Sequence, residues 1–141
     1  MSPLVRAALR SYAVAVVVFL VLDLVWLTVV ARRLYDELLG PLLADPVRPV
    51  PAVLFYALFV AGLVHFVVLP ALARDSVRWA VGSGAFFGLV TYATWDLTSL
   101  SVLDGFPAAL VPIDLAWGAV LSATVCAVTT LVVRRFSPMR P

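Results

Sequence analysis

Four long stretches of apolar residues, separated by short segments that carry charges, constrain this chain more than any other feature. They cover about residues 12–31, 53–72, 79–100 and 110–133. A helix needs ~20 apolar residues to cross the ~30 Å hydrocarbon core of a bilayer, and each stretch has about that length. We therefore predict an all-α fold: one domain, residues 1–141, forming an integral membrane four-helix bundle.

The composition agrees with a membrane location. Hydrophobic residues make up 64% of the chain and charged residues 13%, whereas soluble domains contain ~45–50% and ~25% of these classes. This balance excludes a water-soluble enzyme, a disordered chain and a nucleic-acid-binding protein. Cys126 is the only cysteine, so no internal disulfide can form, and its apolar surroundings predict a packing role.

The arginines predict the direction in which the spans cross the membrane. All ten basic residues are Arg, and the chain lacks Lys and Asn, a bias typical of GC-rich bacterial genomes. Three arginines lie between the first two spans. The others lie at the two ends of the chain or between the second and third spans: Arg6, Arg10, Arg74, Arg78, Arg134, Arg135 and Arg140. The positive-inside rule then places both termini in the cytoplasm of a bacterium, with the protein in the inner membrane.

Residues 32–43, between the first two spans, have an amphipathic pattern. Leucines recur at every fourth position, and Tyr35 lies beside them. This pattern predicts a short helix on the outer membrane surface, interrupted by Gly40-Pro41. The helix would be either a ledge embedded in the membrane interface or a lid over a site.

Ionisable residues inside apolar stretches are rare and costly, so they mark candidate functional sites. Asp23, Asp96 and Asp114 are such residues, and we consider them candidate catalytic groups. At ~1.5 Å per residue, all three lie ~16–25 Å from the inner ends of their helices. His65 lies only ~10–12 Å from that end, and we expect a packed or hydrogen-bonded imidazole there. The candidate ligand-binding residues at the outer level are Trp26, Tyr56, Tyr92, Thr94 and Trp117.

One face of the third span carries Gly84, Gly88, Tyr92 and Asp96 at every fourth position. The two glycines allow another helix to approach closely. They favour tight packing and, as alternatives, a homodimer or an accessory subunit that contacts another membrane protein through the Gly84/Gly88 face. The Tyr92/Asp96 end presents polar groups along the same line.

The three carboxylates allow several functions. They could tie helices together through hydrogen bonds, line a pocket for a lipid or small apolar molecule, move protons in a small transporter, or hold a divalent metal. A metal is disfavoured because the only His lies at another depth, and no cofactor is indicated. We favour the pocket, with Trp and Tyr rings as apolar walls. In an enzyme, a protonated and an ionised Asp would serve as general acid and general base.

Several strings of residues resemble a known family. They are Asp23-x-x-Trp26-Leu27, Phe55-Tyr56, Gly62, Tyr92-x-Thr94-x-Asp96-Leu97-Thr98 and Asp114-x-x-Trp117-Gly118. The set is similar to a bacterial family of four-span membrane proteins called domain of unknown function 2177, over roughly residues 20–125. The resemblance implies the four-span fold and no particular activity. Trp95 and Ser99 stand where Tyr and Asn are more usual in that family, which puts any role of the amide in doubt.

Overall fold

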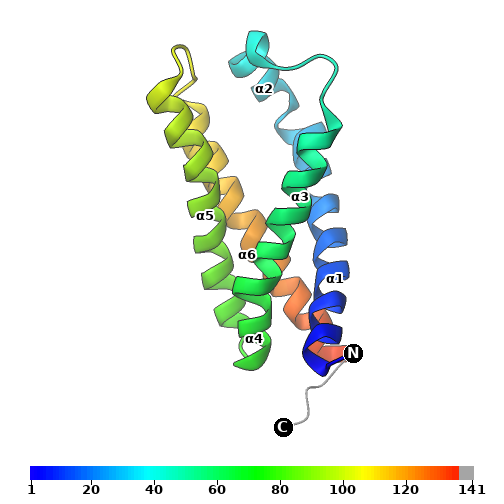
Figure 1. Cartoon of the computed structure of the whole chain (residues 1–141). Coiled ribbons are helices and arrows are strands. Elements are labelled where there is room, and N and C mark those ends of the chain that lie inside the picture. The colour runs from blue at the N-terminus through cyan, green and yellow to red at the C-terminus, as the bar shows by residue number, and fades with distance from the viewer. Residues whose placement is uncertain (137–141) are drawn as a thin grey trace.

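The computed structural model describes residues 1–136, and its regular elements are helices (Figure 1). Four long segments run up and down, and a short helix caps one end of them. The first segment is α1 (Pro3–Val25) with the π-helical turn η1 (Trp26–Val30); the second is α3 (Pro49–Leu63), the π-helical turn η3 (Val64–Val68) and α4 (Leu69–Ala73). The third and fourth are α5 (Val77–Val102) and α6 (Leu110–Phe136), and the cap is α2 (Arg32–Leu39) with the 3₁₀ turn η2 (Gly40–Leu42). The predicted all-α fold is confirmed.

Capping residues extend the helices beyond the apolar stretches that predicted them. α1 begins at Pro3, and the Ser2 hydroxyl oxygen accepts a hydrogen bond from the Val5 amide at 3.3 Å. Ser76 does the same for the Trp79 amide at the start of α5, at 3.1 Å. Serine before a helix satisfies an amide that has no partner inside the helix, and proline fits the first turn. The helix ends therefore follow local chemistry as well as hydropathy.

Two of the long segments contain a π-helical turn, a feature frequent at functional sites. In η1, the Ala31 amide donates to the Trp26 carbonyl at 2.7 Å. The turn η3 ends two residues before Pro70, whose ring would clash with the Phe66 carbonyl in a regular α-helix. His65 lies on η3, where it is exposed and contacts Phe66 edge-on with ring centroids 4.7 Å apart. Its imidazole is therefore not packed in the core.

The closest helix contact joins α5 to α6. Gly84 and Gly88 are buried in it: a Cβ on Gly88 would overlap the Gly118 carbonyl, and one on Gly84 would lie 2.9 Å from the Ser122 carbonyl oxygen. The close approach expected of these glycines thus takes place within the chain. Within the chain, α6 covers the Gly84/Gly88 face. A homodimer or a contact with another membrane protein through this face stays a prediction.

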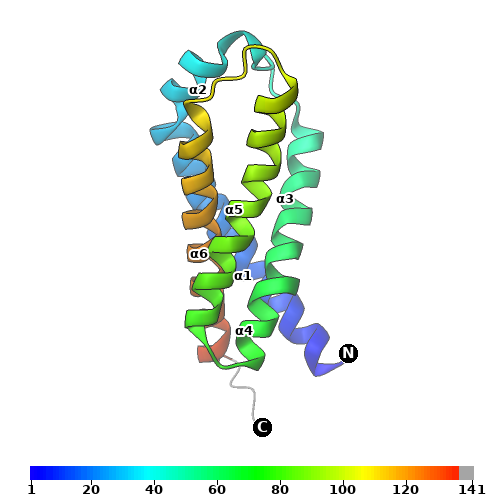
Figure 2. The same cartoon turned by 90° about the vertical axis from the view of Figure 1, so that its left-hand side faces the viewer.

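The two halves of the molecule diverge toward the end that carries α2. η3 and α4 contact both α1 and α5, whereas α3 contacts α1. Figure 1 shows the α5–α6 pair separating from α1 and α3 in that direction, and Figure 2 views the molecule from the side of this pair. The main core fills the narrow part. Its fully buried members include Ala15, Phe19, Leu63, Val68, Leu121 and Cys126. The wide end is left open for a site.

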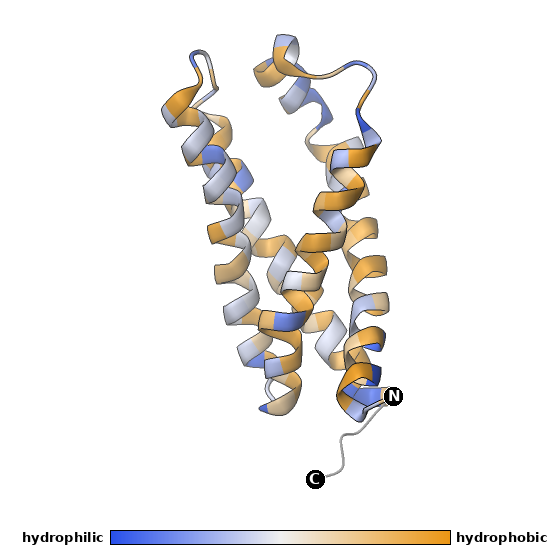
Figure 3. Cartoon of the chain, in the orientation of Figure 1, coloured by the Kyte–Doolittle hydropathy of each residue, from blue (hydrophilic) through white to orange (hydrophobic). Residues whose placement is uncertain are grey.

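Within residues 1–136, three segments are long and apolar enough to cross a membrane: Pro3–Val30, Pro49–Ala73 and Leu110–Phe136. Figure 3 shows their apolar colouring and the paler, more polar α5. α5 has a similar length, 26 residues, but several of its positions are Gly, Ser or Thr. Its crossing of the membrane and the cytoplasmic position of both termini stay predictions. Arg140, one of the arginines that predict this orientation, lies outside the described residues.

An exposed ion pair joins the end of α6 to the turn between α4 and α5. Arg134 Nη2 lies 2.6 Å from Asp75 Oδ1, and the two side chains are 36% and 77% exposed. Exposed pairs contribute ~0–1 kcal/mol, so we expect Asp75→Asn to lower the free energy of unfolding by less than about 1 kcal/mol. Asn also tolerates the positive φ of 49° at this position. Thermal unfolding in detergent at low and high salt tests this, and a larger loss would contradict it.

Candidate functional site

A cavity of about 450 Å³ lies at the wide end of the molecule. Its size and its largely aromatic walls are typical of ligand pockets. Residues from α1, η1, α2, α3, α5 and α6 line it: Asp23, Trp26, Leu27, Tyr35, Ala52, Phe55, Tyr56, Thr91, Tyr92, Trp95 and Trp117. Five of the eight candidate site residues predicted from the sequence are in this set, namely Asp23, Trp26, Tyr56, Tyr92 and Trp117.

Asp23 brings a carboxylate to the cavity wall. It is 5% exposed, and the Tyr56 hydroxyl donates a hydrogen bond to its Oδ2 atom at 2.7 Å. The Phe19 ring packs edge-on against the Tyr56 ring of this pair, with 5.2 Å between their centroids. The pair joins α1 to α3 and is held by packing on one side, so its polar atoms have a fixed position on an otherwise apolar wall.

Asp114 is connected to the cavity through the short helix α2. The Tyr35 hydroxyl donates to Asp114 Oδ1 at 2.7 Å, and the Trp26 indole N–H donates to the Tyr35 oxygen at 3.4 Å. Burial and the neighbouring Asp114 carboxylate raise the pKa of Tyr35, so its phenol stays protonated and can act as the donor. A chain of polar groups thus runs from α6 through α2 to η1.

Apolar contacts also fasten α2 over the wide end. Leu34, Leu38 and Leu39 pack with Tyr35 against the start of α6 and the loop before it, whose buried members are Phe106, Leu110 and Val111. The helix therefore covers the cavity instead of lying apart from the bundle. Of the two predicted roles for this helix, these contacts favour the lid over the ledge.

Two tryptophans from similar strings meet beside the carboxylates. The rings of Trp26 and Trp117 stack with centroids 4.3 Å apart and an angle of 6° between planes. The Trp117 indole N–H is buried near the Asp23 carboxylate but does not close a hydrogen bond with it. An indole donor without a partner inside a protein is costly, so this group is a candidate donor to a ligand or to Asp23 after a small movement.

The remaining predicted residues lie outside the cavity wall. Asp96 is fully buried, and neither of its carboxylate oxygens has a hydrogen-bond partner, although it is close enough to Asp114 for their charges to interact. Thr94 is exposed and donates to the Val90 carbonyl at 2.8 Å. Thr94 follows Tyr92 by two residues, which is a rotation of ~200° around the helix axis. Thr94 therefore faces away from the side on which Tyr92 lines the cavity. The position of Thr94 along its helix did not predict the direction in which its side chain points.

Four aromatic or polar residues that line the cavity were not predicted from the sequence, besides the aliphatic Leu27 and Ala52. Phe55 and Trp95 are exposed aromatic residues, 48% and 61%, on α3 and α5. Thr91 precedes the predicted Tyr92, and Tyr35 lies in α2, outside the apolar stretches. One sequence feature could have identified Tyr35 as a site residue: its position on the apolar side of an amphipathic helix. Among residues 1–136, no group of three His, Cys, Asp or Glu side chains could hold a metal ion.

Comparison with known proteins identifies the family. Residues 8–131 match the family model described as "Predicted membrane protein (DUF2177)". The chain belongs to this family. No curated protein and no solved structure matches it. The region that matches the DUF2177 model contains every residue that lines the cavity, and the description of the family states a membrane protein without an activity.

Proposed function

We propose that this DUF2177 protein binds an amphiphilic, lipid-like molecule in the cavity beneath α2. The apolar part would contact the aromatic walls, and a hydroxyl or carbonyl group would meet the Asp23–Tyr56 pair. One observation carries the proposal: a cavity of about 450 Å³ with aromatic walls and a hydrogen-bonded carboxylate fixed on one side. Such pockets bind ligands through broad apolar contact and a few polar groups that fix orientation.

The exposed rings at the cavity suggest how the ligand enters. Phe55 and Trp95 come from α3 and α5, helices that diverge at this end, and both rings are largely exposed. In a membrane, an exposed apolar side chain on a spanning helix faces lipid. A molecule already dissolved in the bilayer would therefore enter sideways, between these two rings, without passing through water.

We place this site in the outer leaflet of a bacterial inner membrane. The support is the arginine distribution, which puts both termini in the cytoplasm, and the position of α2 at the opposite end of the bundle from the N-terminus (Figure 1). In this orientation α2 would lie at the periplasmic surface as a lid, and the four long segments would form a four-helix bundle around the ligand.

Native mass spectrometry of protein purified in mild detergent tests the proposal. We expect wild-type protein to retain an apolar molecule and Ala52→Phe to retain about tenfold less, equivalent to ~1.4 kcal/mol. Ala52 lines the cavity, so a phenyl group there would occupy its space. Ala57→Phe is the matched control, because Ala57 is exposed on the same helix and does not line the cavity.

Three outcomes would contradict the proposal. Retention of nothing by folded wild-type protein would remove its basis. Equal retention by Ala52→Phe and Ala57→Phe would place the molecule elsewhere on the surface. Proton-driven uptake into vesicles that depends on Asp23 would instead favour a small proton-coupled transporter.

A further inference from the structure

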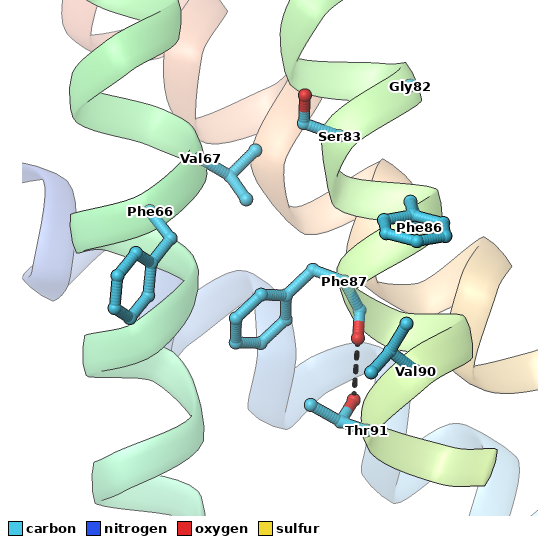
Figure 4. Close-up of a pocket in the computed structure, with 8 residues that line it drawn as sticks. All are labelled: Phe66, Val67, Gly82, Ser83, Phe86, Phe87, Val90 and Thr91. Carbon is cyan, nitrogen blue, oxygen red and sulfur yellow. Dashed lines mark hydrogen bonds between the residues drawn. The ribbon is translucent and has the colours of Figure 1, made fainter.

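A second hollow lies between η3 and α5. It measures about 370 Å³, and Figure 4 shows the side chains of Phe66 and Val67 facing those of Ser83 and Phe87 across it. Its lining residues are Phe66, Val67, Gly82, Ser83, Phe86, Phe87, Val90 and Thr91. We call it the α5 groove. Its lining contains no charged side chain and comes from two of the long helical segments.

Thr91 lines both the cavity and the α5 groove, so the two spaces border on the same residue. Its hydroxyl donates within α5, to the Phe87 carbonyl at 2.9 Å and to the Gly88 carbonyl at 3.1 Å. Figure 4 shows the first of these bonds. Because the hydroxyl is satisfied by its own helix, the junction offers no free polar group to an apolar chain passing over it.

A row of aromatic rings continues from one space into the other. Tyr92 contacts Phe59 with centroids 6.3 Å apart, Phe59 contacts Phe87 at 5.8 Å, and Phe87 stacks on Phe66 at 6.3 Å. Gly62 permits this arrangement, since a Cβ there would lie 2.9 Å from the tip of the Phe87 ring. Tyr92 belongs to the cavity and Phe66 to the α5 groove, so the buried Phe59 connects the aromatic walls of the two spaces.

The combined length suits one hydrocarbon chain. From Trp95 in the cavity to Gly82 in the groove, α5 rises ~20 Å at ~1.5 Å per residue. One leaflet of the hydrocarbon core is ~15 Å thick. The carboxylate and both cavity phenols with hydrogen-bonded hydroxyls, Tyr35 and Tyr56, lie at one end of this path, and the groove end is apolar. This polarity matches a molecule with one polar end and one long tail.

We infer that the ligand is a long-chain lipid whose single acyl or alkyl chain lies in the α5 groove while its polar end meets the Asp23–Tyr56 pair. This inference rests on the proposed function and adds the class of ligand and its orientation. The shared residue Thr91, the row of contacting aromatic rings and the polarity of the two ends carry it together.

Photolabelling with hexadecanol analogues maps both ends of the bound molecule. One analogue carries a diazirine beside the hydroxyl, and the other carries it at the methyl end. We expect the first to label residues of the cavity and the second to label Phe86 and Val90 in the α5 groove. Excess unmodified hexadecanol should suppress labelling by both analogues at these residues. Labelling of Val17, which is 63% exposed on α1, should persist as the background of bulk lipid contact.

A blocking variant tests the groove separately from the cavity. Val90→Trp fills the groove at a position that does not line the cavity. We expect it to reduce methyl-end labelling of the groove about tenfold and to weaken competition by hexadecanol to the same extent, or ~1.4 kcal/mol, while octanol competes as before. Leu89→Trp is the matched control, since Leu89 is the neighbouring residue, is 39% exposed and lines neither space.

The possible results separate the two proposals. If the hydroxyl-end probe labels the cavity but the methyl-end probe labels only background positions, the inference is wrong and the cavity proposal stands. Equal behaviour of Val90→Trp and Leu89→Trp would overturn the inference in the same way. If neither probe labels the cavity and no molecule is retained in native mass spectra, both proposals fail.

Discussion

Gly88→Ala is expected to prevent normal closure of α5 on α6 and to lower the yield of folded protein sharply. A Cβ at this position would overlap the backbone carbonyl of Gly118 and the hydroxyl of Ser122. Backbone cannot turn aside as a flexible side chain can, so the helices would have to separate. Overpacking a tight contact costs ~1–3 kcal/mol, sometimes more, and we expect the upper part of that range. Thermal unfolding and gel filtration in detergent measure it.

Gly82→Ala is the matched control on the same helix. A Cβ there meets no atom within 4 Å, and alanine is more favourable than glycine inside a helix by ~1 kcal/mol. The variant should therefore be as stable as the wild type or slightly more stable. If Gly88→Ala behaves like Gly82→Ala, the packing of α5 on α6 described here is incorrect.

These glycines show which parts of the fold could be predicted from sequence. The four-residue spacing of Gly84 and Gly88 indicated that a helix backbone comes close, and it does. The same spacing is compatible with a helix of a second chain, so it did not identify α6 as the partner. Hydropathy indicated four long helices in the same way. Only three of them are apolar enough to be candidate spans among the described residues, because burial against α6 allows α5 to carry more polar residues.

The candidate site was predictable by depth and less so by direction. A rise of ~1.5 Å per residue correctly grouped Asp23, Tyr56 and Trp117 at one level. Direction requires knowing which neighbour each helix face meets, and for this reason Thr94 was included although it faces away. Tyr35 was not included because α2 lies outside the apolar stretches, where depth along a span has no meaning.

The catalytic role of the three carboxylates stays a prediction, and the structure gives them different surroundings. Asp23 lines the cavity, Asp114 is held by Tyr35 of the lid, and Asp96 is buried without a hydrogen-bond partner. A general acid and general base would both have to reach one ligand. Tyr35 holds one oxygen of Asp114, which does not line the cavity, so we expect joint action of Asp23 and Asp114 to require movement of α2.

Tyr35→Phe is expected to loosen this lid. The change removes the hydroxyl that donates to Asp114 at 2.7 Å and accepts from Trp26 at 3.4 Å. A hydrogen bond to a charged group contributes ~1.5–3 kcal/mol, so the open form of α2 should become roughly tenfold to a hundredfold more populated. Amide hydrogen exchange across Arg32–Leu39 should accelerate by that factor, and trypsin should cleave faster after Arg32 and Arg33.

Two further variants decide whether the Tyr35–Asp114 bond is responsible. Asp114→Asn keeps an acceptor oxygen for Tyr35 but removes the charge, so exchange in α2 should rise less than in Tyr35→Phe. Tyr12→Phe removes a comparable bond at 3.2 Å, from Tyr12 to the Ala57 carbonyl, and should leave exchange in α2 unchanged because neither residue contacts the lid cluster. If amide hydrogen exchange in α2 is as slow in Tyr35→Phe as in the wild type, leucine packing alone holds α2 closed. The Tyr35–Asp114 bond then does not control access to Asp114.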